Sequence, residues 1–205
     1  MSIRRIFGAL AICSLVSGVF AQEQMYTAVK HDLEWEGKKV SGSHNGKVGL
    51  SKGWLKKDGD KIVDGWFEVD LKTMTCEDLK APEWNKKLID HLFSDDFFSV
   101  ESHPMATLKV NEAIPKAGDK WVFNTDLTIK GITHPLIFEA ELETKDGNLE
   151  FDADLVIDRT KYEIRYGSGS FFKGLGDKLI YDNFEVDMEV VLAADSSPET
   201  KVETE

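Results

Sequence analysis

The residues LIFEAELETKDGNLEFDADLVI, numbered 136–157, decide the fold of this chain. Apolar side chains occupy every second position of 136–142 and again of 149–157, and most of the positions between them are glutamate or aspartate. Such alternation indicates two β-strands, each with one apolar face and one polar face. Asp146-Gly147 separates the two runs, and this dipeptide between alternating runs is a strong signal for a β-hairpin.

The same period of two recurs along most of the chain. We expect strands at about 26–35, 48–55, 62–71, 106–110, 121–130, 136–142, 149–157 and 184–192. Residues 37–46 are interpreted as a polar turn, and residues 131–135 as a connection. About eight strands with one apolar row each must either close into a barrel or stack as a sandwich, because each apolar face needs a cover. Periodicity alone does not separate these two all-β architectures.

One short helix interrupts the strands. Trp84, Leu88, Ile89 and Leu92 recur at three- and four-residue spacing, which is typical of the buried face of a helix. Pro82 precedes this face at a position where a missing N–H costs little. Ser94-Asp95-Asp96 follows the helix, and short polar side chains of this kind bond to local backbone groups at turns. A single helix among many strands suggests a plug or a lid at one end of the fold.

The first 21 residues have the features of a secretory signal peptide. Arg4 and Arg5 precede an apolar run over residues 6–20, and the small Ala21 precedes a polar segment. A retained membrane anchor is the alternative, but the run is shorter than the roughly 20 apolar residues that a span needs. A lipoprotein site at Cys13 is disfavoured because the bulky Ile12 stands before the cysteine. We therefore expect export, to the periplasm or outside the cell, after cleavage near Ala21.

The expected mature chain is one domain over residues 22–193, followed by a disordered acidic tail over 194–205. Removing residues 1–21 takes away two arginines and no acids, which moves the formal net charge from −12 to −14. Nucleic acid is excluded as a partner because phosphate binding needs clustered lysine and arginine. The same charge disfavours stable insertion into, or binding to, an anionic membrane. The oligomeric state is open, with a homodimer as one alternative.

No metal site, cofactor or active site is predicted. The five histidines show none of the paired spacings that metal sites use, and Asp95-Asp96 lacks the rest of a calcium loop. Cys76 is the only cysteine after the signal peptide and is interpreted as a small buried hydrophobe rather than a reactive thiol. An enzyme would have to pair His91 with Asp95 or Asp96 and use Ser94 or Cys76 as nucleophile, and no catalytic motif surrounds these residues.

Three motifs follow one another along the chain: the run over residues 91–98, then Pro104, and the Leu-Thr-Ile-Lys-Gly-Ile-Thr-His-Pro run over residues 127–135. Together they resemble the YceI-like family of exported lipid- or polyisoprenoid-binding proteins. The pattern Gly42-x-His44-x-Gly46 resembles a subgroup of this family, and residues 159–168 resemble its closing region. The likeness covers about residues 26–192. This sequence departs from the common family pattern at position 89, where Ile89 stands in place of an arginine. Recognition of a lipid headgroup by the charge of that arginine is therefore not expected here.

The resemblance implies an elongated, lipocalin-like antiparallel barrel of eight strands with a short helix near one end and an apolar interior that holds an isoprenoid or similar amphiphilic chain. Aromatic residues exceed what a thin sheet must cover, which agrees with such an interior. The expected lining is Trp54, Phe67, Val69, Leu71, Leu92, Phe97, Phe98, Leu108, Phe123, Leu127, Ile129 and Phe138. His91, Ser94 and Asp96 are expected to fix the helix and its loop, with contact to a lipid headgroup as the alternative.

Three functions remain in competition. The first is an exported carrier or buffer of an apolar or amphiphilic lipid, without enzymatic activity. The second is a barrel with a filled core that acts through its acidic surface, as an envelope-stress or partner-binding protein. The third is a hydrolase or isomerase that uses His91 and Asp96. The identity of the lipid and of a delivery partner does not follow from the sequence.

Overall fold

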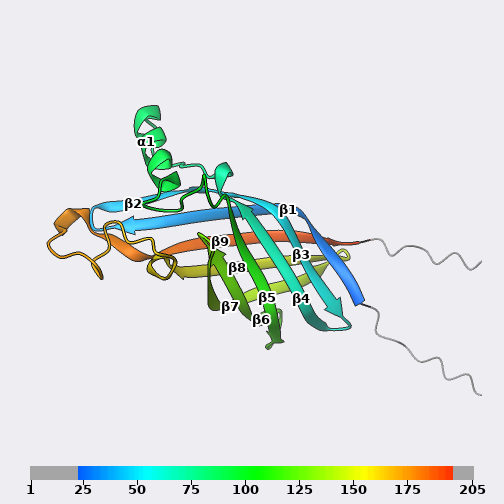
Figure 1. Ribbon diagram of the computed structural model, residues 1–205. Coiled ribbons are helices and arrows are strands. Elements are labelled where there is room, and N and C mark those ends of the chain that lie inside the picture. The colour runs from blue at the N-terminus through cyan, green and yellow to red at the C-terminus, as the bar shows by residue number, and fades with distance from the viewer. Residues whose placement is uncertain (1–22, 196–205) are drawn as a thin grey trace, which may run out of the picture.

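The computed structural model describes residues 23–195, so the predicted signal peptide and residues 196–205 of the predicted tail lie outside the described residues. Figure 1 shows a long antiparallel barrel with one α-helix beside one end. The strands are β1 Glu23–Lys39, β2 Gly42–Lys47, β3 Gly49–Asp58, β4 Lys61–Asp70, β5 Met105–Pro115, β6 Lys120–Ile129, β7 Ile132–Lys145, β8 Asn148–Asp158 and β9 Ile180–Ala194. The helices are α1 Pro82–Phe93 and the 3-10 turns η1 Leu71–Thr73, η2 Arg159–Tyr162 and η3 Gly176–Lys178.

Eight of the strands form the closed barrel, which confirms the predicted fold class. The order β1-β3-β4-β5-β6-β7-β8-β9 is completed by antiparallel pairing of β9 with β1, from Tyr26 opposite Ala194 to Lys39 opposite Ile180. The remaining strand, β2, pairs with β1 alone and lies outside this cycle. Closure through the first and last strands leaves the eight barrel strands without a free sheet edge at this seam.

The alternation in the sequence becomes the division between the inside and the outside of the barrel. In β8 the apolar residues Leu149, Phe151, Ala153, Leu155 and Ile157 are buried, while the acidic residues between them face solvent. Their partners on β9 are also buried: Val190 lies opposite Phe151, and Met188 lies opposite Ala153. The hairpin predicted at Asp146-Gly147 is present, and both residues have the positive φ that its tight turn requires.

Two segments interpreted as turns are strands instead. Residues 37–46 form the end of β1 and most of β2, which have no apolar row because β2 contains only polar residues and glycine. Residues 132–135 belong to β7, and the connection is only Lys130-Gly131, both at positive φ. Pro135 misled the interpretation of this segment. It lies where β7 has no partner strand on its β8 side, a place where a sheet tolerates a residue without an N–H.

The wall between β7 and β8 is paired at one end only. Pairing runs from Glu141 opposite Asp152 to Lys145 opposite Asn148, next to the turn, whereas residues 132–140 of β7 pair with β6 alone. The ring of Tyr162 from η2 is buried beside this gap and meets the ring of His134 edge-on at 5.5 Å between centroids. Side chains rather than backbone hydrogen bonds therefore close this part of the wall.

The helix α1 and the long segment between β8 and β9 lie at the same end of the barrel (Figure 1). Pro82 is the first residue of α1, as predicted, and Leu92 is buried against the core. Trp84 was wrongly expected on the buried face. Its side chain is 55% exposed, and the Lys87 ammonium lies 5.2 Å from the ring centroid. The helix therefore contacts the barrel mainly through its C-terminal turn.

The segment between η1 and α1 crosses β2 closely enough that one position must be glycine. The amide of Thr75 donates to the carbonyl of Lys47 at 2.8 Å, and that of Glu77 donates to the carbonyl of Asn45 at 2.8 Å. A Cβ added to Gly46, between these two residues, would lie 1.9 Å from the carbonyl oxygen of Thr75. No real contact is this short, so a side chain at Gly46 must separate the two segments.

We expect Gly46→Ala to destabilise the protein by about 1–3 kcal/mol, the usual cost of forcing extra atoms into a packed contact. Urea unfolding followed by tryptophan fluorescence measures this loss. Gly37→Ala on the adjoining strand is the matched control, because its added Cβ meets no atom within 4 Å. Equal stability of the two variants would contradict the close approach.

Candidate functional site

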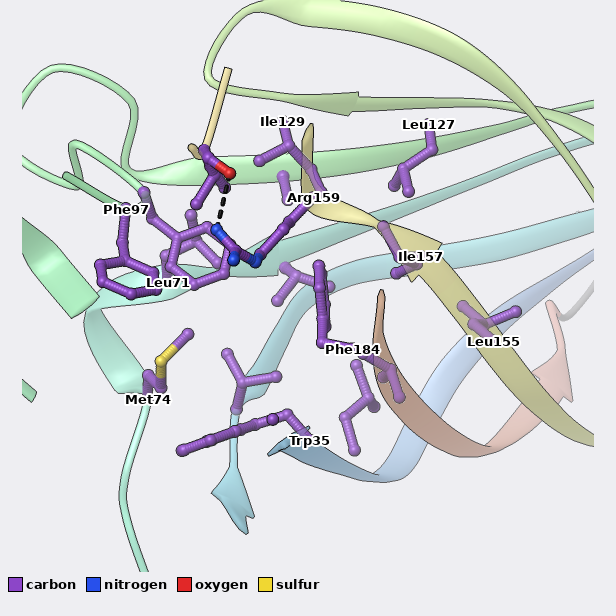
Figure 2. A pocket seen from close by; sticks show the side chains of 18 of the residues that line it. Trp35, Leu71, Met74, Phe97, Leu127, Ile129, Leu155, Ile157, Arg159 and Phe184 are labelled. Atoms are coloured by element: carbon purple, nitrogen blue, oxygen red, sulfur yellow. Dashed lines mark hydrogen bonds between the residues drawn. The ribbon is translucent and has the colours of Figure 1, made fainter. Parts of the chain in front are cut away.

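An apolar cavity of about 150 Å³ occupies the half of the barrel next to α1. Figure 2 shows its wall, with Trp35, Leu71, Met74, Phe97, Leu127, Ile129, Leu155, Ile157 and Phe184 arranged around the space. The strands supply most of this wall, α1 supplies Leu92, and the turn after α1 supplies Phe97 and Phe98. The end of α1 therefore covers one side of the cavity, in agreement with the expectation of a plug or lid.

The structure places most of the predicted lining residues on this cavity. They are Phe67, Val69, Leu71, Leu92, Phe97, Phe98, Leu108, Leu127 and Ile129. They come from β4, β5, β6, η1, α1 and the turn that follows α1. Segments up to 62 positions apart in the chain thus share one apolar surface, as the two-residue periodicity of the strands requires.

Phe123 and Phe138 fill the other half of the barrel rather than line the cavity. Their rings stack at 5.7 Å between centroids, and Phe151 meets Phe123 edge-on at 5.3 Å. Phe67 touches Phe151 at 5.4 Å and also lines the cavity, so this ring forms the boundary between the two halves. The prediction was right that these rings point inward, but the period of two does not tell which depth of the barrel is packed solid.

Trp54 was wrongly expected inside the barrel. Its neighbour Leu55 is fully buried, and successive side chains of a strand point to opposite faces, so Trp54 faces outward. It lies opposite Trp66 on β4, which is also an outward position because Phe67 is buried. The error arose because a large aromatic residue was assigned to the core by its type and not by its place in the alternation.

Among residues 23–195, the sequence interpretation missed the one arginine of the cavity wall, Arg159, at the mouth of the cavity. It continues the alternation Leu155, Ile157, Arg159, so the signal that it points inward was present in the sequence. Its side chain is only 4% exposed, and Figure 2 shows it projecting into the space between the apolar residues. Trp35, Met74 and Phe184 were missed as well, and for Trp35 the alternation with Leu33 gave the same signal.

Backbone carbonyls hold the Arg159 guanidinium in place. Its Nε donates to the carbonyl of Tyr181 at 3.0 Å, Nη1 to that of Ile164 at 2.8 Å and Nη2 to that of Ile180 at 3.0 Å. These contacts join the end of β8 to the start of β9. Burial lowers the pKa of Arg159 from its ordinary value, although the nearby charges of Asp182 and Asp158 oppose this effect.

Asp182 supplies the counter-charge for this buried guanidinium. Its Oδ1 lies 3.6 Å from Nη2 of Arg159 and is the buried side-chain oxygen that lacks a hydrogen bond within residues 23–195. Its Oδ2 accepts a hydrogen bond from the hydroxyl of Ser170 at 2.5 Å. Burial raises the pKa of Asp182, but hydrogen bonding from Ser168 and Ser170 and the Arg159 charge outweigh it, so the pKa lies below its ordinary value.

His91, Ser94 and Asp96 lie together at the end of α1 and do not line the cavity. The hydroxyl of Ser94 donates to the carbonyl of His91 at 2.7 Å, and Nε2 of His91 lies 3.1 Å from Oδ2 of Asp96. The His91 ring also meets the rings of Phe97 and Tyr166 edge-on, at 4.9 and 4.6 Å between centroids. This geometry matches an anchor for the turn that carries Phe97 and Phe98.

The same contacts do not form a nucleophile–base pair. The Ser94 hydroxyl bonds to a backbone carbonyl, whereas the ring of His91 contacts a carboxylate and two aromatic rings. The Sγ atom of Cys76 lies 3.2 Å from Asp78, in a different part of the fold. A catalytic nucleophile needs its base within hydrogen-bond reach, and within residues 23–195 no hydrogen bond joins the ring of His91 to Ser94 or to Cys76.

With this geometry in place, comparison with known proteins identifies the family. A model of the YceI-like domain matches residues 21–192. The chain belongs to the YceI-like family. Among curated relatives, a UPF0312 protein of Photorhabdus laumondii is 45% identical over 58 residues, which are 27% of this chain and 30% of that protein. Protein YceI of Escherichia coli O157:H7 is 31% identical over 90 residues, which are 40% of this chain and 46% of that protein.

Solved YceI-like structures share the fold. BcnA of Burkholderia cenocepacia superposes with a TM-score of 0.62 at 20% identity, covering 78% of this chain and 95% of BcnA. A polyisoprenoid binding domain from Saccharophagus degradans gives 0.59 at 14% identity, covering 83% and 98%. The YceI protein of Campylobacter jejuni gives 0.51 at 13%, covering 96% and 94%. Within residues 23–195, no helix is long and apolar enough to cross a membrane.

The Arg159–Asp182 pair makes stability depend on pH in the acid range. Because the folded state lowers the pKa of Asp182, this carboxylate stabilises the fold above its unfolded pKa of about 3.9. The contribution is lost as the pH falls through the lower folded value. We expect Asp182→Asn to be less stable than the parent protein at pH 7 and the difference to shrink below about pH 4.

Urea midpoints of the two proteins between pH 7 and pH 3 measure this difference. Asp177→Asn, on the exposed neighbouring turn η3, is the control and leaves the midpoints unchanged. A constant difference between Asp182→Asn and the parent protein at all pH values would show that the carboxylate charge is not responsible.

Proposed function

We propose that this protein is a non-enzymatic binding protein that holds the apolar chain of an isoprenoid or similar amphiphilic lipid in its barrel. The observation that carries this proposal is the cavity beside α1, whose wall is built from apolar side chains of six barrel strands and the turn after α1. A polar substrate would find almost no partner there. The likeness in fold to a polyisoprenoid binding domain supports the same ligand class.

The energy of binding comes from removing the lipid chain from water. Apolar surface gains about 25 cal/mol per Å² on burial, or about 0.8 kcal/mol for each methylene group. A dry apolar cavity of 150 Å³ is large enough for a benzene-sized molecule. A prenyl chain is longer than this, so one end of it enters the cavity and the remainder widens the barrel or leaves through its mouth.

Arg159 holds the end of β8 to the start of β9 and does not offer a free positive charge to a ligand. Three of its five N–H groups already bond to backbone carbonyls, and Asp182 lies beside it as counter-charge. A phosphate headgroup would have to compete with Asp182 for the charge of this guanidinium. Affinity therefore depends on the chain of the lipid, and alcohols and phosphates with the same prenyl chain bind similarly.

Native mass spectrometry of protein purified without detergent tests the proposal directly. A discrete added mass that organic extraction identifies as a lipid supports it, and so does saturable uptake of added undecaprenol. An apo mass that stays unchanged after incubation with undecaprenol overturns it. That outcome favours the second hypothesis, a filled barrel that acts through its acidic surface.

We expect a side chain that fills the cavity to weaken lipid binding without unfolding the protein. Ala106 is buried on β5 and lines the cavity, so the ring of Ala106→Phe enters the space that the lipid would occupy. We expect farnesol binding, measured by quenching of tryptophan fluorescence, to weaken about tenfold or more, the equivalent of about 1.4 kcal/mol. Lys109→Phe adds the same ring to an exposed position of β5 and is the matched control.

Equal farnesol affinity of Ala106→Phe, Lys109→Phe and the parent protein would place the ligand elsewhere. Urea unfolding of both variants separates a blocked cavity from a misfolded barrel, because only the former keeps a cooperative transition while losing affinity.

We also propose that the protein works after export. The apolar run over residues 6–20, the two arginines before it and the small Ala21 support this proposal. We expect the protein recovered from the periplasm or the medium to begin at Gln22, which the intact mass and N-terminal sequencing determine. A chain that keeps residues 1–21 and stays in the membrane fraction would favour the anchored form instead.

A further inference from the structure

Three metal-ligating side chains that are distant in the sequence meet outside the barrel, away from the lipid cavity. Nδ1 of His44 lies 2.8 Å from Oδ2 of Asp78, and Sγ of Cys76 lies 3.2 Å from Oδ1 of the same carboxylate. One ligand atom from each residue lies within 4.8 Å of the others. This is the group of three histidine, cysteine or acidic side chains with metal-site spacing within residues 23–195.

The fold holds these residues together by a backbone contact rather than by chance proximity. His44 lies on β2, whereas Cys76 and Asp78 lie on the segment that leads to α1. That segment pairs with β2 through two backbone hydrogen bonds, and the amide of Asn45 donates to Oδ1 of Asp78 at 3.1 Å. The glycine at position 46 permits the approach. The Gly-x-His-x-Gly pattern of the sequence, for which the cavity gives no role, thus places a histidine opposite a cysteine.

The donor set is that of a transition-metal ion. Zinc binds thiolate at about 2.3 Å, imidazole nitrogen at about 2.0–2.1 Å and carboxylate oxygen at about 2.0–2.2 Å, in tetrahedral geometry. Ligand atoms of such a site lie roughly 3.3–3.7 Å apart, as these bond lengths require. The present separations, 2.8 Å and 3.2 Å to the two oxygens of Asp78 and at most 4.8 Å within the group, bracket this range. Hard cations such as Ca²⁺ and Mg²⁺ are disfavoured because they take oxygen ligands.

We propose that His44, Cys76 and Asp78 bind one Zn²⁺ ion, with the fourth position open to water or an added ligand. On binding, the Cys76 thiol gives up its proton to solvent and the thiolate sulfur bonds to the metal. His44 ligates through the lone pair of neutral Nδ1. One thiolate and one carboxylate then balance the two positive charges of the ion, so the occupied site is neutral.

Two of the three proposed ligand side chains are partly exposed to solvent, so an ion can enter and leave the site. The side chains of His44 and Asp78 are 25% and 29% exposed, which leaves a path for the ion. Cys76 is 7% exposed, which shields the sulfur on its inner side. The site has three protein ligands and one open position. A closed structural zinc site has four protein ligands, so we expect metal or ligand to exchange more readily here.

Cobalt titration of the purified full chain tests the proposal, because Co²⁺ adopts the same geometry and shows a thiolate charge-transfer band in the near ultraviolet. We expect one Co²⁺ per chain, this band, and loss of the band when Zn²⁺ is added. Cys76→Ser abolishes the band, and His44→Gln weakens Co²⁺ binding by at least about tenfold, a loss that mutation of even outer-shell partners causes.

One variant serves as the matched control, because Cys76 is the only cysteine after residue 21. His31→Gln removes an exposed histidine from β1. It keeps the band and the affinity. The proposal is overturned if the parent protein shows no thiolate band with Co²⁺, or if Cys76→Ser keeps it. The parent titration decides the question even where a variant folds poorly, and neither result depends on lipid binding.

Discussion

The barrel depends on the pairing of its first strand with its last. β1 and β9 run antiparallel from Tyr26 and Ala194 at one end to Lys39 and Ile180 at the other. Without this seam the eight strands would form an open sheet with two long edges and one apolar face in water. To make it, the chain must bring together residues that are more than 140 positions apart, at a loss of loop entropy. Burial of the single apolar row on each of the eight barrel strands offsets this loss.

Closure leaves an interior that the chain fills unevenly. Phe123, Phe138 and Phe151 pack one half solidly, and the other half keeps an apolar space under α1. The buried Arg159 marks the mouth of that space, where β8 leaves the barrel and β9 re-enters it. Its hydrogen bonds replace the strand pairing that ends there. The cavity is thus bounded by packed phenylalanine rings at its base and by the hydrogen-bonded guanidinium of Arg159 at its mouth.

The sequence predicts those parts of the structure in which apolar and polar residues alternate. The β7–β8 hairpin and the inward direction of Phe67, Leu108 and Leu127 follow from this rule. It fails for β2, which has no apolar residue, because pairing with β1 and with the segment after η1 holds that strand. The alternation also does not tell how deep in the barrel a side chain lies. Nor does it predict that His44 lies beside Cys76, because a long-range backbone contact brings these two residues together. Arg159 obeyed the alternation and was missed because a charged residue was not expected inside.

The partly unpaired wall between β7 and β8 has a consequence for the size of the interior. Backbone pairing there is confined to Glu141–Lys145, in the filled half, while the wall beside the cavity is closed by side chains such as Tyr162. Moving β7 away from β8 in that half breaks no strand hydrogen bond. Over residues 132–140 the distance between β7 and β8 therefore depends on side-chain packing, and a change of side-chain size in this wall alters the width of the barrel without breaking a strand hydrogen bond.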